Sequence, residues 1–311
     1  MIGFDIGGTK CAVCVGDVKK DKIVVTNKRV FATNSARTPY EMLEWMCIAA
    51  EEMTDDCSLA GISCGGPLDT TRGLILSPPN LPSWDSIPVV EWVEKRLGCR
   101  AALRNDADAC ALAEWRYGAG RGSDSMVFIT FGTGFGAGVI VNGGLWQGFS
   151  SRAGELGHVR LAKRGPIGYY KHGSVEGFCS GGGIAQQGRK AVKKALEEGI
   201  KLPYCNSKYE LDSINAKLLA DYARQGEPIA RGVYDTVAMR LGEALAMLFD
   251  ILDPETVVIG SIFERCEDLL RPGMERVLFR EALRGNDCKV VPAVLGDSIG
   301  DIAALTVAQE V

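Results

Sequence analysis

The chain has 311 residues, of which 46% are hydrophobic and 24% are charged, and its formal net charge is −4. The length and apolar content suit about two domains with hydrophobic cores. The net negative charge disfavours nucleic acid and anionic lipid surfaces as partners. The N-terminal residues lack a basic segment followed by an apolar run, and no uninterrupted apolar stretch of about 18 residues occurs. We therefore predict a cytoplasmic protein with no membrane partner.

The first third of the sequence predicts an α/β sheet. Apolar alternation predicts strands over 2–6, 11–15, 23–30, 59–63 and 101–103, helices over 39–53 and up to residue 97, and a proline-rich loop over 67–88. Residues 7–10 form a tight turn between the first two strands. Alternating strands and helices indicate an α/β arrangement after an antiparallel start.

A second cycle repeats this opening. Strands over 126–131 and 137–141 flank a turn at 132–134, as the first two strands flank the turn at 7–10, and this indicates two duplicated halves. A glycine-rich stretch follows over 154–183, and the rest predicts helices at about 184–198, 215–223 and 227–252, a strand over 256–259 and a helix from 298. No linker separates the halves, so we expect them to pack across a cleft.

The cysteines indicate a reducing compartment. There are eleven, an odd number, and they are scattered through apolar segments, which is typical of buried thiols. Cys11 and Cys14 have CxxC spacing, but a strand sends positions an odd step apart to opposite faces. A redox or zinc role stays the alternative to a role in the core.

The two glycine turns are candidate phosphate clamps. Glycine allows backbone N–H groups to approach a phosphate closely. Neither turn is a P-loop or a dinucleotide fingerprint, because each joins strand to strand. A plain β-hairpin is the alternative for either turn alone. The pair favours phosphate binding, since Asp5 precedes the first turn and Thr9 and Thr133 each follow a glycine.

Seven motifs in order resemble the ROK family of sugar kinases, repressors and uncharacterised proteins. They occur at 5–10, 61–67, 80–82, 105–107, 132–136, 155–158 and 176–181. The resemblance implies the duplicated actin-like ATPase (ribonuclease H-like) fold, with ATP and sugar meeting in the interdomain cleft of a homodimer. Its two α/β domains would be 1–104 plus about 297–311, and 105–296.

The resemblance also implies an ATP-dependent kinase acting on the 6-hydroxyl of a hexose or N-acetylhexosamine. Asp106 would be the general base that accepts the hydroxyl proton, which suits a reaction that depends on positioning and charge stabilisation. The local sequence alone also allows Asn105 or Asp106 to cap the helix over 107–117, and the two roles are compatible. A helix N-terminus would favour the ionised carboxylate.

The remaining site residues are carried over from the family motifs. The sugar contacts would be Gly66, Asn80, Asn105, Glu155, His158 and Glu176. The ATP side would use Asp5 through Mg²⁺-bound water, together with Gly7, Gly8, Thr9, Lys10, Thr133, Gly134, Gly260 and Ser261. For the two glutamates and Lys10 the alternative is a solvated surface side chain, and for His158 a structural role. Gly-Gly is more usual in the family than Gly260-Ser261.

One departure from the family concerns zinc. Many ROK proteins hold a structural zinc with a histidine and three cysteines, but the aligned cysteine positions here are Ile167, Tyr169 and Ser174. Cys179 alone would not complete a four-ligand site. We therefore predict no structural zinc, and a loop held by packing, with Tyr169, Tyr170 and Phe178 as candidates.

Two other functions remain as alternatives. The first is a non-catalytic, sugar-sensing regulatory protein, because the family includes repressors. Those repressors carry a DNA-binding region ahead of the first glycine turn. We expect no room for such a region before residue 5. The second is a nucleotide-dependent switch without sugar chemistry. The presence of Asp106, Glu155 and Glu176 favours the kinase.

Overall fold

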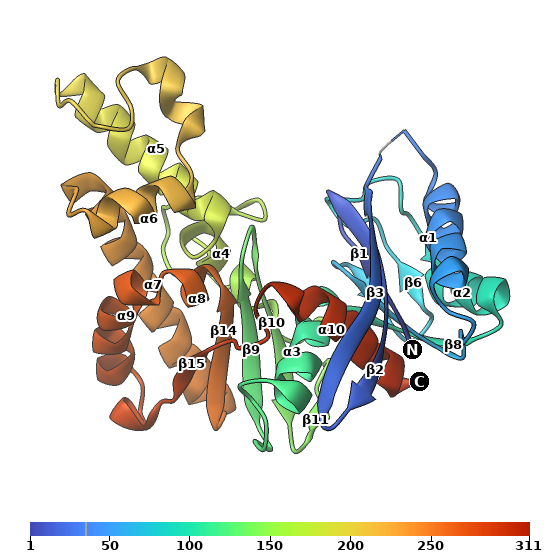
Figure 1. The fold of residues 1–311 in the computed structure, drawn as a ribbon. Helices are drawn as coiled ribbons and strands as arrows, with labels where there is room; N and C mark the ends of the chain where they lie inside the picture. Colours follow the sequence, from blue (N-terminus) through green and yellow to red (C-terminus); the bar gives the residue numbers. More distant parts are fainter. Residues whose placement is uncertain (35) are drawn as a thin grey trace. The chain divides into compact units, whose positions relative to one another are not determined.

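The computed structural model describes residues 1–34 and 36–311, which form two compact units (Figure 1). Unit 1 comprises Met1–Phe128, Gly138–Ala153 and Val294–Val311, and unit 2 comprises Ile129–Ala137 and Gly154–Ala293. The sequence placed the domain boundaries after residue 104 and after about residue 296, and these domain boundaries stay a prediction. The compact units differ from them chiefly in placing residues 105–128 and 138–153 in unit 1.

Unit 1 is built on a five-stranded sheet of order β3-β2-β1-β4-β8. Its strands are β1 (Ile2–Ile6), β2 (Lys10–Lys19), β3 (Lys22–Ala32), β4 (Leu59–Cys64) and β8 (Arg100–Asn105). β1, β2 and β3 are antiparallel neighbours, whereas β1, β4 and β8 run parallel. The predicted antiparallel start followed by an α/β arrangement is confirmed.

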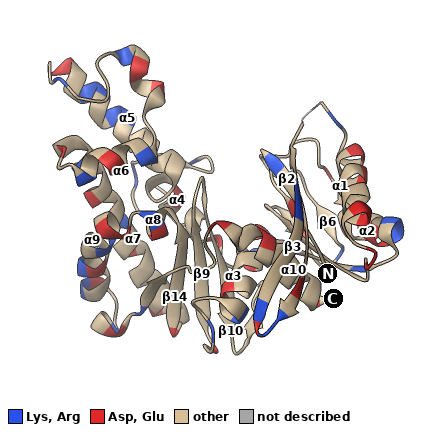
Figure 2. Cartoon of the chain, viewed as in Figure 1, with Lys and Arg blue, Asp and Glu red and all other residues tan. Residues whose placement is uncertain are grey.

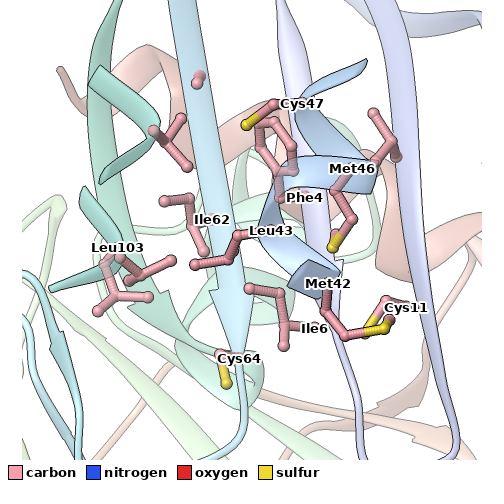
Figure 3. Close-up of a cluster of buried hydrophobic side chains, with 14 of the residues drawn as sticks. Phe4, Ile6, Cys11, Met42, Leu43, Met46, Cys47, Ile62, Cys64 and Leu103 are labelled. Atoms are coloured by element: carbon pink, nitrogen blue, oxygen red, sulfur yellow. The ribbon is translucent and has the colours of Figure 1, made fainter. Parts of the chain in front are cut away.

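Helices cover both faces of this sheet. Helix α1 (Pro39–Met53) and α2 (Val89–Leu97) share one buried core with Phe4 and Ile6 of β1, and Figure 3 shows α1 side chains meeting these strands. Helix α10 (Ile299–Val307) packs on the other face, where a Cβ at Gly3 would lie 2.9 Å from Ala304 Cβ. Successive strand residues therefore point to opposite faces, as the alternation predicted.

A second five-stranded sheet has the order β11-β10-β9-β14-β15. Its strands are β9 (Met126–Phe131), β10 (Phe135–Val141), β11 (Gly144–Leu145), β14 (Thr256–Ser261) and β15 (Val290–Pro292), and β14 is parallel to β15. The pair β9 and β10 with its glycine turn repeats the pair β1 and β2. Helix α3 (Asp106–Tyr117), in unit 1, contacts β10 so closely that a Cβ at Gly138 would lie 2.6 Å from Ala107 O.

The larger helices of unit 2 were predicted only in part. Those found are α5 (Gly181–Glu197), α6 (Ala216–Arg224), α7 (Pro228–Leu252) and α9 (Glu267–Glu281), and the four-residue helix α8 (Ile262–Arg265) precedes α9. The sequence predicted α5, α6 and α7 but missed α9, which has Pro272 in its interior, where proline normally disfavours a helix. The loop over 67–88 holds three short strands, β5 (Leu68–Asp69), β6 (Leu74–Ile75) and β7 (Ile87–Pro88).

All eleven cysteines are free thiols. Cys11 belongs to the core under α1, whereas Cys14 packs with Leu305 of α10 on the other face, so the pair does not form one site. Burial raises the pKa of Cys14 to about 12. These are the inert thiols expected of core positions. Across residues 1–34 and 36–311 no helix combines the length and apolar character that membrane crossing requires.

Candidate functional site

The unit 1 site residues gather at the carboxyl ends of three parallel strands. Ile6 of β1 pairs with Cys64 of β4, and Cys64 pairs with Asn105 of β8, so these three strands end side by side. Gly7, Gly65 and Asp106 directly follow those ends, and Gly66 is the next residue after Gly65. Ligands of open α/β sheets bind outside the carboxyl ends of the strands. Residues far apart in the sequence thus lie along one edge of the unit 1 sheet.

Asn105 and Asp106 occupy the N-terminus of α3. The Asn105 side chain accepts a hydrogen bond from the N–H of Ala107 at 2.9 Å, and Asp106 Oδ1 accepts from the same N–H at 2.8 Å. Both capping roles considered for this helix are therefore present. The Asp106 side chain is also accessible to solvent, and partial desolvation by the surrounding protein raises its pKa above the usual range. A carboxylate with these properties suits proton acceptance from a bound hydroxyl.

The close neighbours of Asp106 complete this edge. A Cβ at Gly65 would lie 3.8 Å from Asp106 Oδ2, and one at Gly66 would lie 3.2 Å from Asn105 Nδ2. Asn80 approaches from its loop and lies against the first glycine turn, where a Cβ at Gly8 would be 2.4 Å from Asn80 Cβ. A side chain at position 8 would collide with Asn80, so the first glycine turn requires glycine at this position.

Asp5 lies in an acidic environment within unit 1. Burial, then the charges of Asp106 and Asp301, raise its pKa to about 6, while Lys10 and Lys28 oppose that shift. Lys28 Nζ donates to Asp301 Oδ2 at 2.7 Å. Lys28 and Asp301 carry no signal in the sequence, because neither belongs to a motif and only the fold brings them near Asp5.

The first glycine turn suits phosphate binding. The N–H of Gly7 donates to Lys10 O at 3.1 Å and closes the turn. Within the described part of the chain, no group accepts a hydrogen bond from the N–H of Gly8 or Thr9. Lys10 begins β2 with an exposed side chain. Exposed, unpaired backbone N–H groups beside a lysine are the donors that an anionic phosphate needs.

The second glycine turn, in unit 2, has the same design. Gly132 N–H donates to Gly134 O at 3.1 Å, and Gly181 N–H donates to Gly132 O at 2.8 Å. The N–H groups of Thr133 and Gly134 find no acceptor among residues 1–34 and 36–311. Ser261, at the end of β14, lies beside this turn, since a Cβ at Gly132 would be 3.4 Å from Ser261 Oγ. Gly260, which precedes it, is buried in the strand.

The carboxylate of Glu176 is fixed against this turn. Glu176 lies on α4 (Val175–Phe178), and its Oε2 accepts a hydrogen bond from Phe135 N–H at 3.1 Å. A Cβ at Gly134 would lie 2.9 Å from the same oxygen. Glu155 and His158 begin and end a neighbouring 3₁₀ turn, whose Gly157 packs so closely on β10 that a Cβ there would be 2.1 Å from Phe135 O. The three predicted sugar contacts of unit 2 therefore lie around the start of β10.

A hairpin stands where the family zinc cysteines would align. It consists of β12 (Ile167–Gly168) and β13 (Lys171–His172). The Gln186 side chain forms hydrogen bonds of 3.0 and 2.8 Å with the backbone N–H and C=O of Ile167. Buried Ser174 Oγ accepts from Gly177 N–H at 3.1 Å and lies 3.3 Å from Gly168 O. Backbone and side-chain hydrogen bonds thus hold the loop.

The expected aromatic packing of this loop is only partly correct. Phe178 is buried, and a Cβ at Gly165 would lie 2.6 Å from its ring. Tyr169 contacts the His158 ring edge-on at 5.9 Å, whereas Tyr170 is 88% exposed and meets the ring of its neighbour Tyr169 at 5.6 Å. The described residues include no group of three or more His, Cys, Asp or Glu side chains placed to hold a metal. The absence of zinc stays a prediction.

Comparison with known proteins agrees with this geometry. The model of the ROK family matches residues 1–311. A glucokinase of Thermotoga maritima is 32% identical over 283 residues, covering 87% of this chain and 84% of that protein. A glucokinase of Streptomyces coelicolor is 30% identical and covers 99% and 97% of the two chains.

The fold also matches a solved structure. A ROK family glucokinase from Streptomyces griseus, in complex with glucose and AMPPNP, superimposes with a TM-score of 0.79 at 28% identity, covering 100% of this chain and 99% of that one. This likeness confirms the predicted duplicated actin-like ATPase fold.

Proposed function

Since the chain belongs to the ROK family, we propose that it is an ATP-dependent sugar kinase that phosphorylates the 6-hydroxyl of a hexose or N-acetylhexosamine. The observation that carries this proposal is the placement of Asp106. Its accessible carboxylate lies at the carboxyl ends of β1, β4 and β8, on the same edge as the glycine turn after β1. The names and the complex of the relatives support the same activity.

Asp106 acts in this proposal as the general base. Its carboxylate accepts the proton of the sugar hydroxyl as that oxygen forms its bond to phosphorus. The raised pKa of the carboxyl makes it a better proton acceptor than an ordinary aspartate. Asn105, hydrogen-bonded to the first turn of α3, holds the neighbouring position and offers its amide N–H to the sugar.

The residues around the glycine turns fit a nucleotide and a cation. ATP and Mg²⁺, when bound, would supply the transferable phosphoryl group and the compensation of its charge. The free N–H groups of Gly8, Thr9, Thr133 and Gly134 would contact phosphate oxygens. Asp5 would hold Mg²⁺ through water, since a cation relieves the repulsion that its carboxylate experiences. We assign four further residues to nucleotide binding, namely Gly7, Lys10, Gly260 and Ser261.

The sugar is assigned to side chains rich in hydrogen-bonding groups. A hexose carries several hydroxyls, and carboxylates and amides each satisfy more than one of them. We assign the contacts to Asn80, Asn105, Glu155, His158 and Glu176, with Gly66 leaving room beside Asn105. The fixed position of Glu176 supports this role, because a carboxylate that is already held loses little freedom when it binds.

We also propose that the enzyme works in the cytoplasm as a homodimer. The scattered free thiols agree with a reducing compartment. The homodimer rests on the family resemblance and is tested by measuring the mass in solution at several concentrations.

A sugar panel with ADP detection tests the kinase assignment. Purified protein is mixed with ATP, Mg²⁺ and single sugars, among them glucose, mannose, fructose, N-acetylglucosamine and N-acetylmannosamine, and the phosphorylated position is read by ³¹P NMR. We expect sugar-dependent ADP release with at least one of them and a 6-phosphate product. Sugar binding without any ADP release would instead identify a non-catalytic sugar sensor.

A further inference from the structure

Unit 2 contains an open groove outside the proposed kinase site. It has a volume of about 880 Å³ and lies between α5, α7 and the hairpin β12–β13. Its floor is apolar and includes the buried side chains of Phe178, Ala195 and Val233. None of the residues assigned to the sugar or the nucleotide lines it. The groove is therefore a separate feature with its own ligand requirements.

Positive charge dominates the groove. Arg164, Lys190, Lys194 and Arg240 line it, and Figure 2 marks the basic residues along α5. The single carboxylate among the described lining residues, Glu198, lies 3.7 Å from Lys194, and Arg240 pairs with Glu243, which does not line the groove. No described residue forms an ion pair with Arg164 or Lys190, so both remain available to a ligand.

Arg240 is fixed at the floor of the groove. Its guanidinium lies 4.9 Å above the Phe178 ring, and one nitrogen donates to Glu243 at 2.8 Å. Its Nε is buried and, within the described part of the chain, has no hydrogen-bond partner. The buried Nε does not reach a ligand in the groove, so Arg240 would meet a planar or tetrahedral anion through the terminal nitrogen that does not bond to Glu243.

We propose that this groove binds a small phosphorylated metabolite, with the phosphate held by Arg164, Lys190 and Arg240 and the body of the molecule against the apolar floor. The volume lies within the range of about 300–1,000 Å³ that is usual for small-molecule sites. An uncharged ligand would leave the cations unused, and a second protein surface would have to bring acidic residues into the groove. The phosphate chemistry is shared by sugar phosphates and nucleotides, and the experiment separates these two sources.

A ligand in the groove would contact the segment that positions Glu176. Ile167 and His172 of the hairpin line the groove, and Gln186, also in the lining, holds Ile167 by two hydrogen bonds. The next residue, Gly168, lies against α4, where a Cβ would be 2.4 Å from Gly177 N. Since Glu176 precedes Gly177, occupation of the groove is expected to change the KM for sugar, and this consequence rests on the proposed function.

Calorimetric titration of the full chain tests the site without relying on catalysis. The probes are fructose 1,6-bisphosphate for sugar phosphates, AMP for nucleotides, and inorganic phosphate for the anion alone. The variant is Lys190→Glu, and its matched control is Lys193→Glu, an exposed lysine of α5 outside the groove. Thermal unfolding of both variants verifies that each is folded.

We expect either the bisphosphate or AMP to bind more tightly than inorganic phosphate. Lys190→Glu should weaken that binding at least about tenfold, because a charge-assisted hydrogen bond contributes about a decade or more of affinity. Lys193→Glu should leave it unchanged. Binding that is equal in both variants would place the ligand elsewhere, and no binding of any probe would refute the proposal. A concentration-dependent dimer that only Lys190→Glu dissociates would show that the groove is an interface between copies.

Kinetic measurement then tests the coupling. With the ligand bound, the KM for sugar should change about fivefold, a typical coupling between two sites. An unchanged KM in the presence of saturating ligand would contradict the link from the groove to Glu176.

Discussion

Glu176 and Phe135 are joined by a hydrogen bond of 3.1 Å between Glu176 Oε2 and the Phe135 backbone N–H. Phe135 directly follows the glycine turn after β9, so this bond connects a proposed sugar carboxylate to a proposed phosphate turn within unit 2. A movement of the turn therefore moves the carboxylate.

The substitution Gly134→Ala tests this connection. The added Cβ would lie 2.9 Å from Glu176 Oε2, closer than Cβ contacts allow, so the carboxylate must shift. We expect the KM for sugar to rise about tenfold or more, since a charge-assisted hydrogen bond contributes roughly that much. The control is Gly144→Ala, whose Cβ would meet only Val141 O, at 3.9 Å. An unchanged KM in Gly134→Ala would show that Glu176 does not bind the sugar.

The raised pKa of Asp5 predicts a pH-dependent stability. A carboxyl that titrates at about 6 when folded and at 3.8 when unfolded binds protons more tightly in the folded state. Stability from this group is therefore full below about pH 4 and falls as the pH rises to about 6, by up to about 2–3 kcal/mol. Asp5→Asn removes this loss, so the variant should be the more stable protein at neutral pH.

Thermal unfolding without Mg²⁺ or nucleotide measures the effect. The melting temperature of Asp5→Asn should exceed that of the wild type at pH 7.5, and the difference should disappear near pH 4. Subtracting the two curves removes the titration of groups that do not interact with Asp5 and leaves the contribution of Asp5 with its charged neighbours. A difference that does not depend on pH would contradict the repulsive environment described for Asp5.

Ser261 predicts a stabilising substitution. It has a φ of 64° and a ψ of −110°, a conformation that costs a non-glycine residue about 1–3 kcal/mol. Ser261→Gly should stabilise the protein by about 1 kcal/mol after the larger backbone entropy of glycine is counted. Ser261→Ala keeps the Cβ and should bring no such gain. Urea unfolding of the two variants decides the matter, and equal stabilities would argue against strain at this position.

Metal analysis tests the predicted absence of structural zinc. The side chains of Gln186 and Ser174 donate hydrogen bonds to Ile167 O and Gly168 O and hold the hairpin where many family members carry zinc cysteines. We expect purified protein to contain no stoichiometric zinc, and its melting temperature to be unaffected by a chelator. Stoichiometric zinc whose removal lowers the melting temperature would overturn this account of the loop.

The sequence predicted well the elements that local chemistry defines. Helix α1 was predicted at its observed bounds, because Pro39 follows Thr38, and the Thr38 and Glu41 side chains form a capping box. β9 was also predicted at its observed bounds, since its mostly apolar run begins after Ser125 and ends at Gly132. Helix α9 was missed because Pro272 interrupts the signal by which a helix is recognised.

Parts of the site depend on contacts that no local pattern contains. Asp301 is 296 residues after Asp5, and it affects the Asp5 pKa only because α10 packs beside β1. The hydrogen bond from Phe135 to Glu176 involves a backbone group, which carries no residue signature. The expectation that Tyr170 packs the loop was wrong for a related reason, since an aromatic residue at a hairpin tip has no neighbouring element to cover it.

The turnover of Asp106→Asn with ATP and the preferred sugar tests the central claim most directly. The amide keeps the shape of the side chain but does not accept the hydroxyl proton, so kcat should fall by about 100-fold to 10,000-fold. The KM for ATP should stay close to that of the wild type and the melting temperature should not fall, while all parameters of the control Asp17→Asn should stay unchanged. Sugar-dependent ADP release at the wild-type rate in Asp106→Asn would contradict the account.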